Sequence, residues 1–338
     1  MHYRLLGKSG LRVSELCLGT MTFGEDWGWG ASKDESRSIF EAFVEAGGNF
    51  IDTANNYTNG TSEKFVGEFV QADRDHFVIA TKYSLTERKD DPNFGGNHRK
   101  NMRRSVEGSL KRLGTDYIDL LWLHMWDYMT PVEEVMRALD DLVRAGKVLY
   151  VGVSDTPAWV VSAANVLAAT RGWSRFVAYQ GEYSLASRTP ERDILPMTRA
   201  LDMTYLAWGM LEGGELTGKY NSPSKEAKRS EDTSDRIKGM ATVLLGLAKE
   251  IGHTPSQVAL NWVRQSPYRI LPILGARTQA QVRDNLGCLD FELTADQIMK
   301  LNAASPIELG FPQAFLTSDH VHRLIFGETF GKFEARDR

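Results

Sequence analysis

Eight short apolar segments alternate with longer segments of mixed polarity along the chain, and this alternation limits the folds open to it. Each apolar segment is continuous, as in a strand that is covered on both faces. Strands that alternate with helices form a parallel sheet, which is either open and doubly wound or closed into a barrel. Eight strands favour a closed (β/α)8 TIM barrel. The segments are Glu15–Gly19, Asn49–Asp52, Phe77–Thr81, Ile118–Leu123, Val148–Val153, Phe176–Tyr179, Met203–Ala207 and Ile270–Leu274.

Four of the intervening segments begin with a helix-capping pattern. A Ser or Thr followed three residues later by Glu or Gln can close the first turn, because the side chain of each residue bonds to the backbone of the other. Pro131 and Pro255 stand where the first helical residue would lie, a position that needs no N–H donor. Helices are therefore predicted to begin at Ser32–Glu35, Thr130–Glu133, Thr254–Gln257 and Thr294–Gln297.

The chain is predicted to form a single domain, because 338 residues fit one barrel and no Pro-rich or Ser-rich linker divides residues 1–338. The first 14 residues stand outside the alternation, and a hairpin of Tyr3–Leu6 with Leu11–Val13 is expected to plug the lower mouth of the barrel. The polar residues 221–235 predict a mobile loop. The tail, 305–338, either covers a pocket or packs against another subunit of a homo-oligomer.

Charge and cysteine content exclude several classes of function. Lys and Arg number 40 and Asp and Glu 44, so the net charge of −4 provides no basic field for phosphate backbones, and no nucleic-acid partner is expected. Two cysteines, Cys17 and Cys288, are too few for a disulfide framework and indicate a reducing compartment. Without a signal-peptide core or an apolar run of 18 residues, we expect a cytoplasmic protein with no membrane contact. His320 and His322 have no apparent third ligand, so no metal is predicted.

Polar residues follow the predicted strands at their carboxyl ends, where barrel enzymes build their active sites. Singly, each has an ordinary structural role, such as a helix cap or a surface charge. Asp, Lys and His buried together cost free energy unless they are paired, so their convergence predicts a functional site. The residues are Gly19–Thr20, Asp52, Lys82, His124, Ser154–Asp155, Gln180, Trp208 and Gly275–Arg277, with Tyr57 in the loop after the second strand.

At these positions the sequence resembles the aldo-keto reductase superfamily. The matching residues are Phe50–Ala54 followed by Tyr57, then Ala80–Lys82, then Leu123–His124, which give that family's Asp, Tyr, Lys and His in order. The resemblance extends over roughly residues 1–315 and is strongest to the bacterial aryl-alcohol-dehydrogenase-like and channel β-subunit-like branches.

The chemistry of this set follows from its residue types. Carbonyl reduction needs a hydride donor and a proton donor, and an isolated tyrosine gives up its proton reluctantly at neutral pH. Lys82 beside Tyr57 would lower the tyrosine pKa, and Asp52 would keep the ammonium charged. His124 would orient the substrate oxygen. Tyr57 would then protonate the developing alkoxide as the general acid.

No Gly-x-Gly-x-x-Gly lies between a strand and a helix, so a Rossmann-type cofactor site is not predicted. The resemblance instead implies an extended NADP(H) across the barrel mouth. Arg277 is expected at the 2′-phosphate, because a guanidinium fork suits phosphate, and this favours NADPH over NADH. The implied cofactor residues are Gly19, Thr20, Met21 and Asp52 near the nicotinamide; Ser154, Asp155, Gln180 and Trp208 around its ring; Gly209, Leu211, Gly213 and Lys219 at the pyrophosphate; and Gly275, Ala276, Arg277, Gln281 and Asn285 toward the adenosine.

The sequence departs from the family pattern in two places. Asp155 stands where Asn is usual, and a carboxylate cannot donate to a carboxamide oxygen as an amide can. The stretch Trp208-Gly209-Met210-Leu211 replaces a more usual aromatic residue followed by Ser-Pro-Leu, so a hydroxyl that could meet the pyrophosphate is missing.

Three tryptophans mark a substrate pocket at the barrel mouth. Trp27 and Trp29 follow the first strand and Trp126 follows His124, so they can join Tyr57 and His124 around a substrate, or the loops can simply pack on one another. A pocket of this kind predicts an aromatic or apolar aldehyde or ketone.

We therefore expect an NADPH-dependent oxidoreductase that reduces aldehydes, and ketones in addition, to alcohols. One alternative is a regulatory subunit that binds NADP(H) as a redox sensor and turns over slowly. Another keeps the barrel without the cofactor, as a lyase or isomerase in which Lys82 forms a Schiff base.

Overall fold

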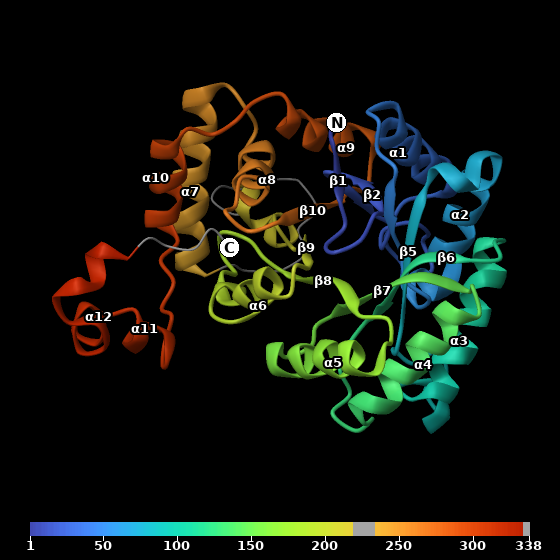
Figure 1. Cartoon of the computed structure of the whole chain (residues 1–338). Coiled ribbons are helices and arrows are strands. Elements are labelled where there is room, and N and C mark those ends of the chain that lie inside the picture. The colour runs from blue at the N-terminus through green and yellow to red at the C-terminus, as the bar shows by residue number, and fades with distance from the viewer. Residues whose placement is uncertain (219–233, 334–338) are drawn as a thin grey trace.

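A closed barrel of eight parallel strands forms the centre of the molecule (Figure 1). The computed structural model describes residues 1–218 and 234–333. Each strand pairs with the next one along the chain, and β10 closes the barrel by pairing with β9 on one side and β3 on the other. The predicted (β/α)8 barrel is thus confirmed. Its strands are β3 (Cys17–Gly19), β4 (Phe50–Asp52), β5 (Val78–Tyr83), β6 (Ile118–Leu123), β7 (Val148–Ser154), β8 (Phe176–Glu182), β9 (Thr204–Trp208) and β10 (Ile270–Gly275).

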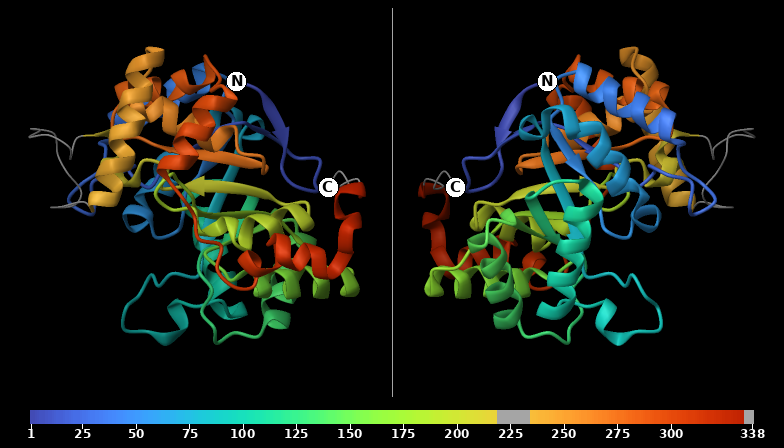
Figure 2. Two further views of the ribbon diagram at one scale, coloured as in Figure 1. Left: turned by 90° about the vertical axis from the view of Figure 1, so that its left-hand side faces the viewer. Right: turned by 90° about the vertical axis from the view of Figure 1, so that its right-hand side faces the viewer.

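Helices surround the barrel, and short 3-10 helices lie in the connections (Figures 1 and 2). The α-helices are α1 (Lys33–Glu45), α2 (Thr61–Val70), α3 (Arg99–Leu113), α4 (Val132–Arg144), α5 (Ala158–Arg171), α6 (Ile194–Ala200), α7 (Asp235–Ile251), α8 (Pro255–Arg264), α9 (Gln279–Leu286), α10 (Ala295–Ala304), α11 (Gln313–Leu316) and α12 (Asp319–Phe326). The 3-10 helices are η1 (Tyr57–Gly60), η2 (Gln71–His76), η3 (Pro92–Phe94), η4 (Thr189–Glu191), η5 (Glu212–Thr217), η6 (Gly287–Leu289) and η7 (Gly327–Lys332).

The predicted capping boxes are complete at two helices, α8 and α10, where Thr254 and Thr294 bond reciprocally with the glutamines three residues on. At α1, Ser32 accepts from the Glu35 backbone, but the Glu35 carboxylate accepts instead from the backbone of Gln279.

The capping box predicted at Thr130–Glu133 is wrong. Pro131 is the N-cap of α4 rather than its first residue, and the helix begins at Val132. The Thr130 hydroxyl donates to the Asp127 carboxylate, which also accepts from the Thr130 backbone. The hydroxyl that was predicted to cap α4 therefore binds an acidic residue upstream of the helix instead.

The N-terminal hairpin closes one end of the barrel, as expected. β1 (Tyr3–Leu5) and β2 (Arg12–Ser14) pair antiparallel, and Leu6 and Val13 pack with inward-facing residues of the barrel strands, among them Phe50 and Trp122. Gly7 lies so close to β8 that an added Cβ would be 2.0 Å from the Val177 carbonyl oxygen. Its φ of +53° also favours glycine. The hairpin turn is thus fitted to the strands that it covers.

The C-terminal tail leaves α10 and runs past the segment between η4 and α6, where Arg192 donates to the Glu308 carbonyl and Gln313 donates to the Arg192 carbonyl (Figures 1 and 2). None of its described residues lines the large cavity discussed below. Of the loop predicted over 221–235, all but the last two residues lie outside the described residues, and α7 begins at Asp235. Within residues 1–218 and 234–333, no helix combines the length and apolar character needed to cross a membrane.

Candidate active site

The four predicted catalytic residues come together at the carboxyl ends of neighbouring strands. Asp52 ends β4, Lys82 lies near the end of β5 and His124 follows β6, while Tyr57 opens η1. Because β4 and β5 pair in register, with Asp52 opposite Ala80, their ends lie at the same edge of the barrel. The backbone then turns sharply after Tyr57, where Thr58 and Asn59 both have positive φ.

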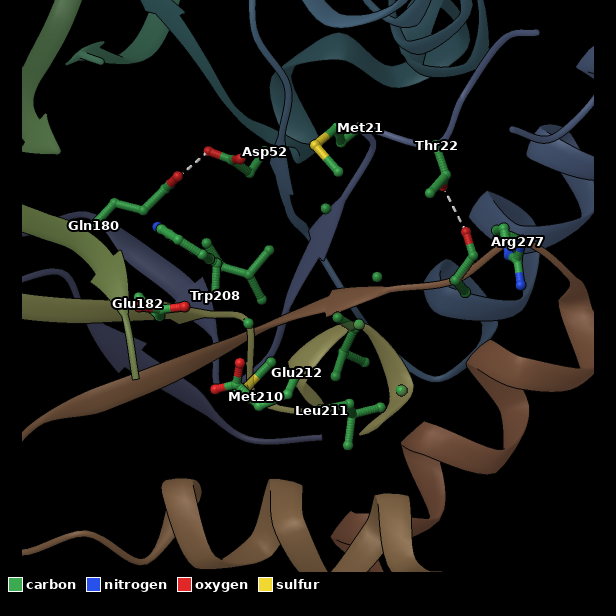
Figure 3. A pocket seen from close by; sticks show the side chains of 18 of the residues that line it. Met21, Thr22, Asp52, Gln180, Glu182, Trp208, Met210, Leu211, Glu212 and Arg277 are labelled. Carbon is green, nitrogen blue, oxygen red and sulfur yellow. Dashed lines mark hydrogen bonds between the residues drawn. The ribbon is translucent and has the colours of Figure 1, made fainter. Parts of the chain in front are cut away.

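Lys82 holds the cluster together. Its ammonium is fully buried and forms an ion pair with the Asp52 carboxylate. The same Nζ lies 2.9 Å from the Thr53 carbonyl oxygen and 3.0 Å from the Tyr57 hydroxyl. The second Asp52 oxygen accepts from Gln180 Nε2 at 2.9 Å, as Figure 3 shows. All three ammonium protons thus have acceptors, and the charge is directed at the tyrosine oxygen.

The turn after Tyr57 is held by hydrogen bonds to the loop that follows β3. The Thr58 hydroxyl donates to the Phe23 carbonyl at 2.6 Å and accepts from the Ser62 backbone at 3.1 Å. The Ser62 hydroxyl in turn donates to the Thr20 carbonyl at 2.8 Å. These bonds stabilise the strained backbone and fix where the tyrosine hydroxyl lies.

Burial and charge set the protonation state of each group. Burial raises the pKa of Tyr57 above its usual value, and the opposing effect of Lys82 only partly offsets it. The expected lowering of the Tyr57 pKa is therefore wrong, because desolvation outweighs the ammonium. Burial works to lower the pKa of Lys82, but Asp52 and the Tyr57 oxygen hold it above its ordinary value. Tyrosine is consequently a phenol and lysine a cation at neutral pH.

His124 is a neutral imidazole that faces the tyrosine. Burial, with the positive charge of Lys82, lowers the pKa of His124 to about 3. Its ring stands edge-on to the Tyr57 ring, with centroids 6.1 Å apart. The buried His124 Nδ1 has no hydrogen-bond partner among the described residues. Tyr57 and His124 both line the cavity and face a ligand bound there.

An elongated cavity of about 850 Å³ runs from this cluster across the barrel mouth to α9. Its volume lies in the range of small-molecule and cofactor sites. The predicted cofactor residues that line it are Gly19, Met21, Asp52, Ser154, Asp155, Gln180, Trp208, Gly209, Leu211, Gly213, Gly275, Ala276, Arg277, Gln281 and Asn285. Thr20 does not line it, because its hydroxyl points back to the Asp52 carbonyl. Lys219 lies outside the described residues.

The lining of this cavity fits an extended dinucleotide. The buried Ser154 hydroxyl has no partner within residues 1–218 and 234–333 and is available to a ligand amide. Trp208 exposes 37 % of its surface and offers a ring for stacking. At the other end, the guanidinium of Arg277 forms no ion pair with any described residue and can meet a phosphate (Figure 3).

Asp155 lies at a bend between β7 and α5. Its φ of +40° is unusual for residues other than Gly, Asn and Asp, and its backbone N–H donates to the Gln180 carbonyl. The Trp208 side chain lies near the Asp155 carboxylate and favours its charged form. Burial raises the pKa of Asp155 to about 6, although Lys82 opposes the shift. The carboxyl is therefore charged at neutral pH.

The predicted aromatic pocket is only partly formed. Trp27 lines the cavity and stands edge-on to Tyr57, with ring centroids 6.4 Å apart. Trp29 instead packs on Trp27, and Trp126 packs against the hydrophobic core. Leu85 and Met125, which the sequence did not single out, line the cavity beside His124.

Sequence reasoning also missed three of the carboxylates that line the cavity, Glu182, Glu212 and Asp284. Glu182 follows Gln180 by two residues on β8 and so shares its face, a signal available once the strand is extended beyond Tyr179. Glu212 lies in η5, where no periodic pattern marks it. The other missed lining residues are Thr22, Asn56, Met210, Gly214, Thr217, Ser256, Leu260, Ile273 and Leu274.

A closed parallel barrel with buried Asp, Tyr, Lys and His beside a long cavity at its carboxyl end defines an α/β-barrel enzyme. The chain matches the Aldo/keto reductase family over residues 15–306, and it belongs to this family of oxidoreductases, whose chemistry is carbonyl reduction.

Several fungal proteins are similar to the chain over most of their length. Norsolorinic acid reductase stcV of Emericella nidulans is 41 % identical, over 93 % of this chain and 84 % of its own. Putative aryl-alcohol dehydrogenase AAD14 of Saccharomyces cerevisiae is 38 % identical, over 94 % and 90 %. An aryl-alcohol dehydrogenase of Phanerodontia chrysosporium, designated NADP(+), is 38 % identical, over 92 % and 87 %.

Proposed function

We propose that this protein is an NADPH-dependent reductase of aldehydes, aromatic ones above all, in which Tyr57 is the proton donor. The observation that carries the proposal is the buried Lys82 ammonium, bonded to both Asp52 and the Tyr57 hydroxyl at the inner end of the cavity. The names of relatives support it, since one is a putative aryl-alcohol dehydrogenase, another is an aryl-alcohol dehydrogenase designated NADP(+), and a third is named norsolorinic acid reductase.

The proton step follows from the protonation states. Burial keeps Tyr57 a phenol, so it holds a proton to donate. As the carbonyl oxygen gains negative charge, the phenol transfers its proton, and the phenolate that remains lies 3.0 Å from the Lys82 ammonium. Asp52 keeps that ammonium in place and charged. His124, neutral and with a free ring nitrogen, orients the same oxygen.

The dinucleotide, when bound, supplies the hydride. Trp208, Ser154 and Gln180 would hold its nicotinamide beside Tyr57, and the residues of η5 and β10 that line the cavity would hold its phosphates. Arg277 would select NADPH over NADH, because a guanidinium that is not paired with a carboxylate gains most from a 2′-phosphate.

Aromatic aldehydes suit the space next to the catalytic cluster. Trp27, Leu85 and Met125 border the cavity near Tyr57 and His124 and offer apolar surface without a cation for a substrate phosphate. A flat, uncharged ring can therefore bury its faces there at little desolvation cost.

The cofactor preference tests the proposal directly. With benzaldehyde derivatives as substrates, the purified protein should oxidise NADPH far faster than it oxidises NADH. Arg277→Met should reduce kcat/KM for NADPH by roughly 10- to 100-fold, about the value of one charge-assisted bond, and leave kcat/KM for NADH within twofold. Equal losses with both cofactors would contradict the role given to Arg277.

A further inference from the structure

The ring end of the cavity carries more negative charge than the catalytic cluster needs. Asp155 and Glu182 both line it, in addition to Asp52. Asp52 is neutralised by Lys82, but neither Asp155 nor Glu182 forms an ion pair with any described residue. Among the described residues, the Glu182 carboxylate accepts a hydrogen bond from the Ser187 hydroxyl alone, at 3.0 Å, and the Asp155 carboxylate lies near the Trp208 side chain.

Both carboxylates lie close to Trp208, whose ring is available for stacking in the cavity. Glu182 is the direct neighbour of Trp208 in the pairing of β8 with β9, and Figure 3 shows both between Gln180 and η5. Asp155 lies near the side chains of both Trp208 and Glu182, and its backbone N–H donates to the Gln180 carbonyl. A ring that stacks on Trp208 therefore lies close to two carboxylates that form no ion pair with any described residue.

On the basis of the proposed function, we infer that Asp155 and Glu182 stabilise the positive charge of the oxidised nicotinamide. The site therefore binds NADP+ more tightly than it would without these two charges. Hydride transfer breaks a C–H bond of the reduced ring and forms one on the carbonyl carbon, while Tyr57 protonates the oxygen. The ring thereby passes from neutral to a charge of plus one. Fixed carboxylates beside it favour that change and need no reorganisation.

The two carboxylates differ in what they contribute. Asp155 is half-buried and near the Lys82 ammonium, and it is charged at neutral pH, because its raised pKa of about 6 still lies below 7. An amide at this position would preserve the size of the side chain and the positive φ, since Asn tolerates the left-handed region. Asp155→Asn therefore removes the charge and little else.

The test compares cofactor affinities rather than activity. NADP+ and NADPH are titrated separately into the full-length protein at pH 7.5 by calorimetry, and the ratio Kd(NADPH)/Kd(NADP+) is formed for each variant. We expect Asp155→Asn to lower this ratio about tenfold and Glu182→Gln to lower it by a smaller factor, as expected for removing one nearby charge in a partly buried site. Asp90→Asn, on an exposed loop at the same end of the barrel, is the matched control and should leave the ratio unchanged.

A ratio that changes less than twofold in Asp155→Asn would overturn the inference, as would an equal loss of affinity for both forms, which would show a structural role alone. In either case tight binding of NADP(H) by the unmutated protein would leave the proposed function standing. If the unmutated protein binds neither form, the proposed function fails and the inference with it.

Discussion

Replacing Lys82 by methionine should destabilise the protein more than any surface charge change, for a reason that can be worked out from its contacts. Methionine retains the apolar stem of the side chain but cannot donate a hydrogen bond and carries no charge. Lys82→Met therefore leaves the Thr53 carbonyl without this donor and the buried Asp52 carboxylate without a counter-ion. Removing one partner of a buried ion pair costs about 3–5 kcal/mol. With an unfolding entropy of about 2.1 cal/mol/K per residue over 338 residues, this corresponds to a fall in Tm of about 4–7 °C.

The double variant Lys82→Met with Asp52→Asn separates charge from packing. It removes the unpaired carboxylate but keeps a side chain of the same shape, so it should regain about 2 kcal/mol relative to Lys82→Met alone while remaining inactive. Urea unfolding followed by circular dichroism at pH 7.5 measures all three proteins. The reasoning is refuted if Lys82→Met costs less than about 1 kcal/mol, or if the double variant is no more stable than the single one.

Two further predictions concern helix packing and pH. An alanine Cβ at Gly67 in α2 would lie 2.3 Å from the Leu113 carbonyl oxygen of α3, so Gly67→Ala should cost about 1–3 kcal/mol in urea unfolding, whereas Gly246→Ala in α7, which faces open space, should gain about 0.5–1 kcal/mol. The ratio Kd(NADPH)/Kd(NADP+) should fall as pH is lowered from 7.5 to 5, because Asp155, with its pKa raised to about 6, becomes neutral. The charged and titratable groups that face Asp155 are Lys82 on β5, Tyr57 on η1, Glu182 and Tyr179 on β8 and Tyr205 on β9. The 2′-phosphate titrates in both cofactor forms, so its effect on the two dissociation constants cancels in the ratio. If the ratio in Asp155→Asn falls with pH as steeply as in the unmutated protein, the pH dependence belongs to another group.

The barrel and the catalytic cluster were predictable because both depend on short-range patterns. Continuous apolar segments mark strands covered on both faces, and parallel strands place their carboxyl ends at one edge. Asp52, Lys82 and His124 each lie at or next to such an end, so their meeting followed from the register of three neighbouring strands. Tyr57 came with them because its loop is only a few residues long.

Other features depend on interactions that a local pattern does not contain. The Thr130 hydroxyl is taken by Asp127 instead of capping α4. Trp126 turns into the core although it lies only two residues from His124. The pKa of Tyr57 reflects a balance between desolvation and the Lys82 charge, and its sign depends on how completely the side chain is buried. Each outcome is decided by tertiary packing rather than by residue type.

The central claim is that Tyr57 donates the proton in carbonyl reduction, and the most direct test is the loss of NADPH absorbance with aromatic aldehydes, measured for the unmutated protein beside Tyr57→Phe. The account predicts rapid turnover that falls at least roughly 1,000-fold in Tyr57→Phe, while NADPH binding, measured by calorimetry, changes less than threefold. Turnover by Tyr57→Phe within tenfold of the unmutated protein would contradict it. So would binding of NADPH by both proteins with no turnover of any aldehyde by either.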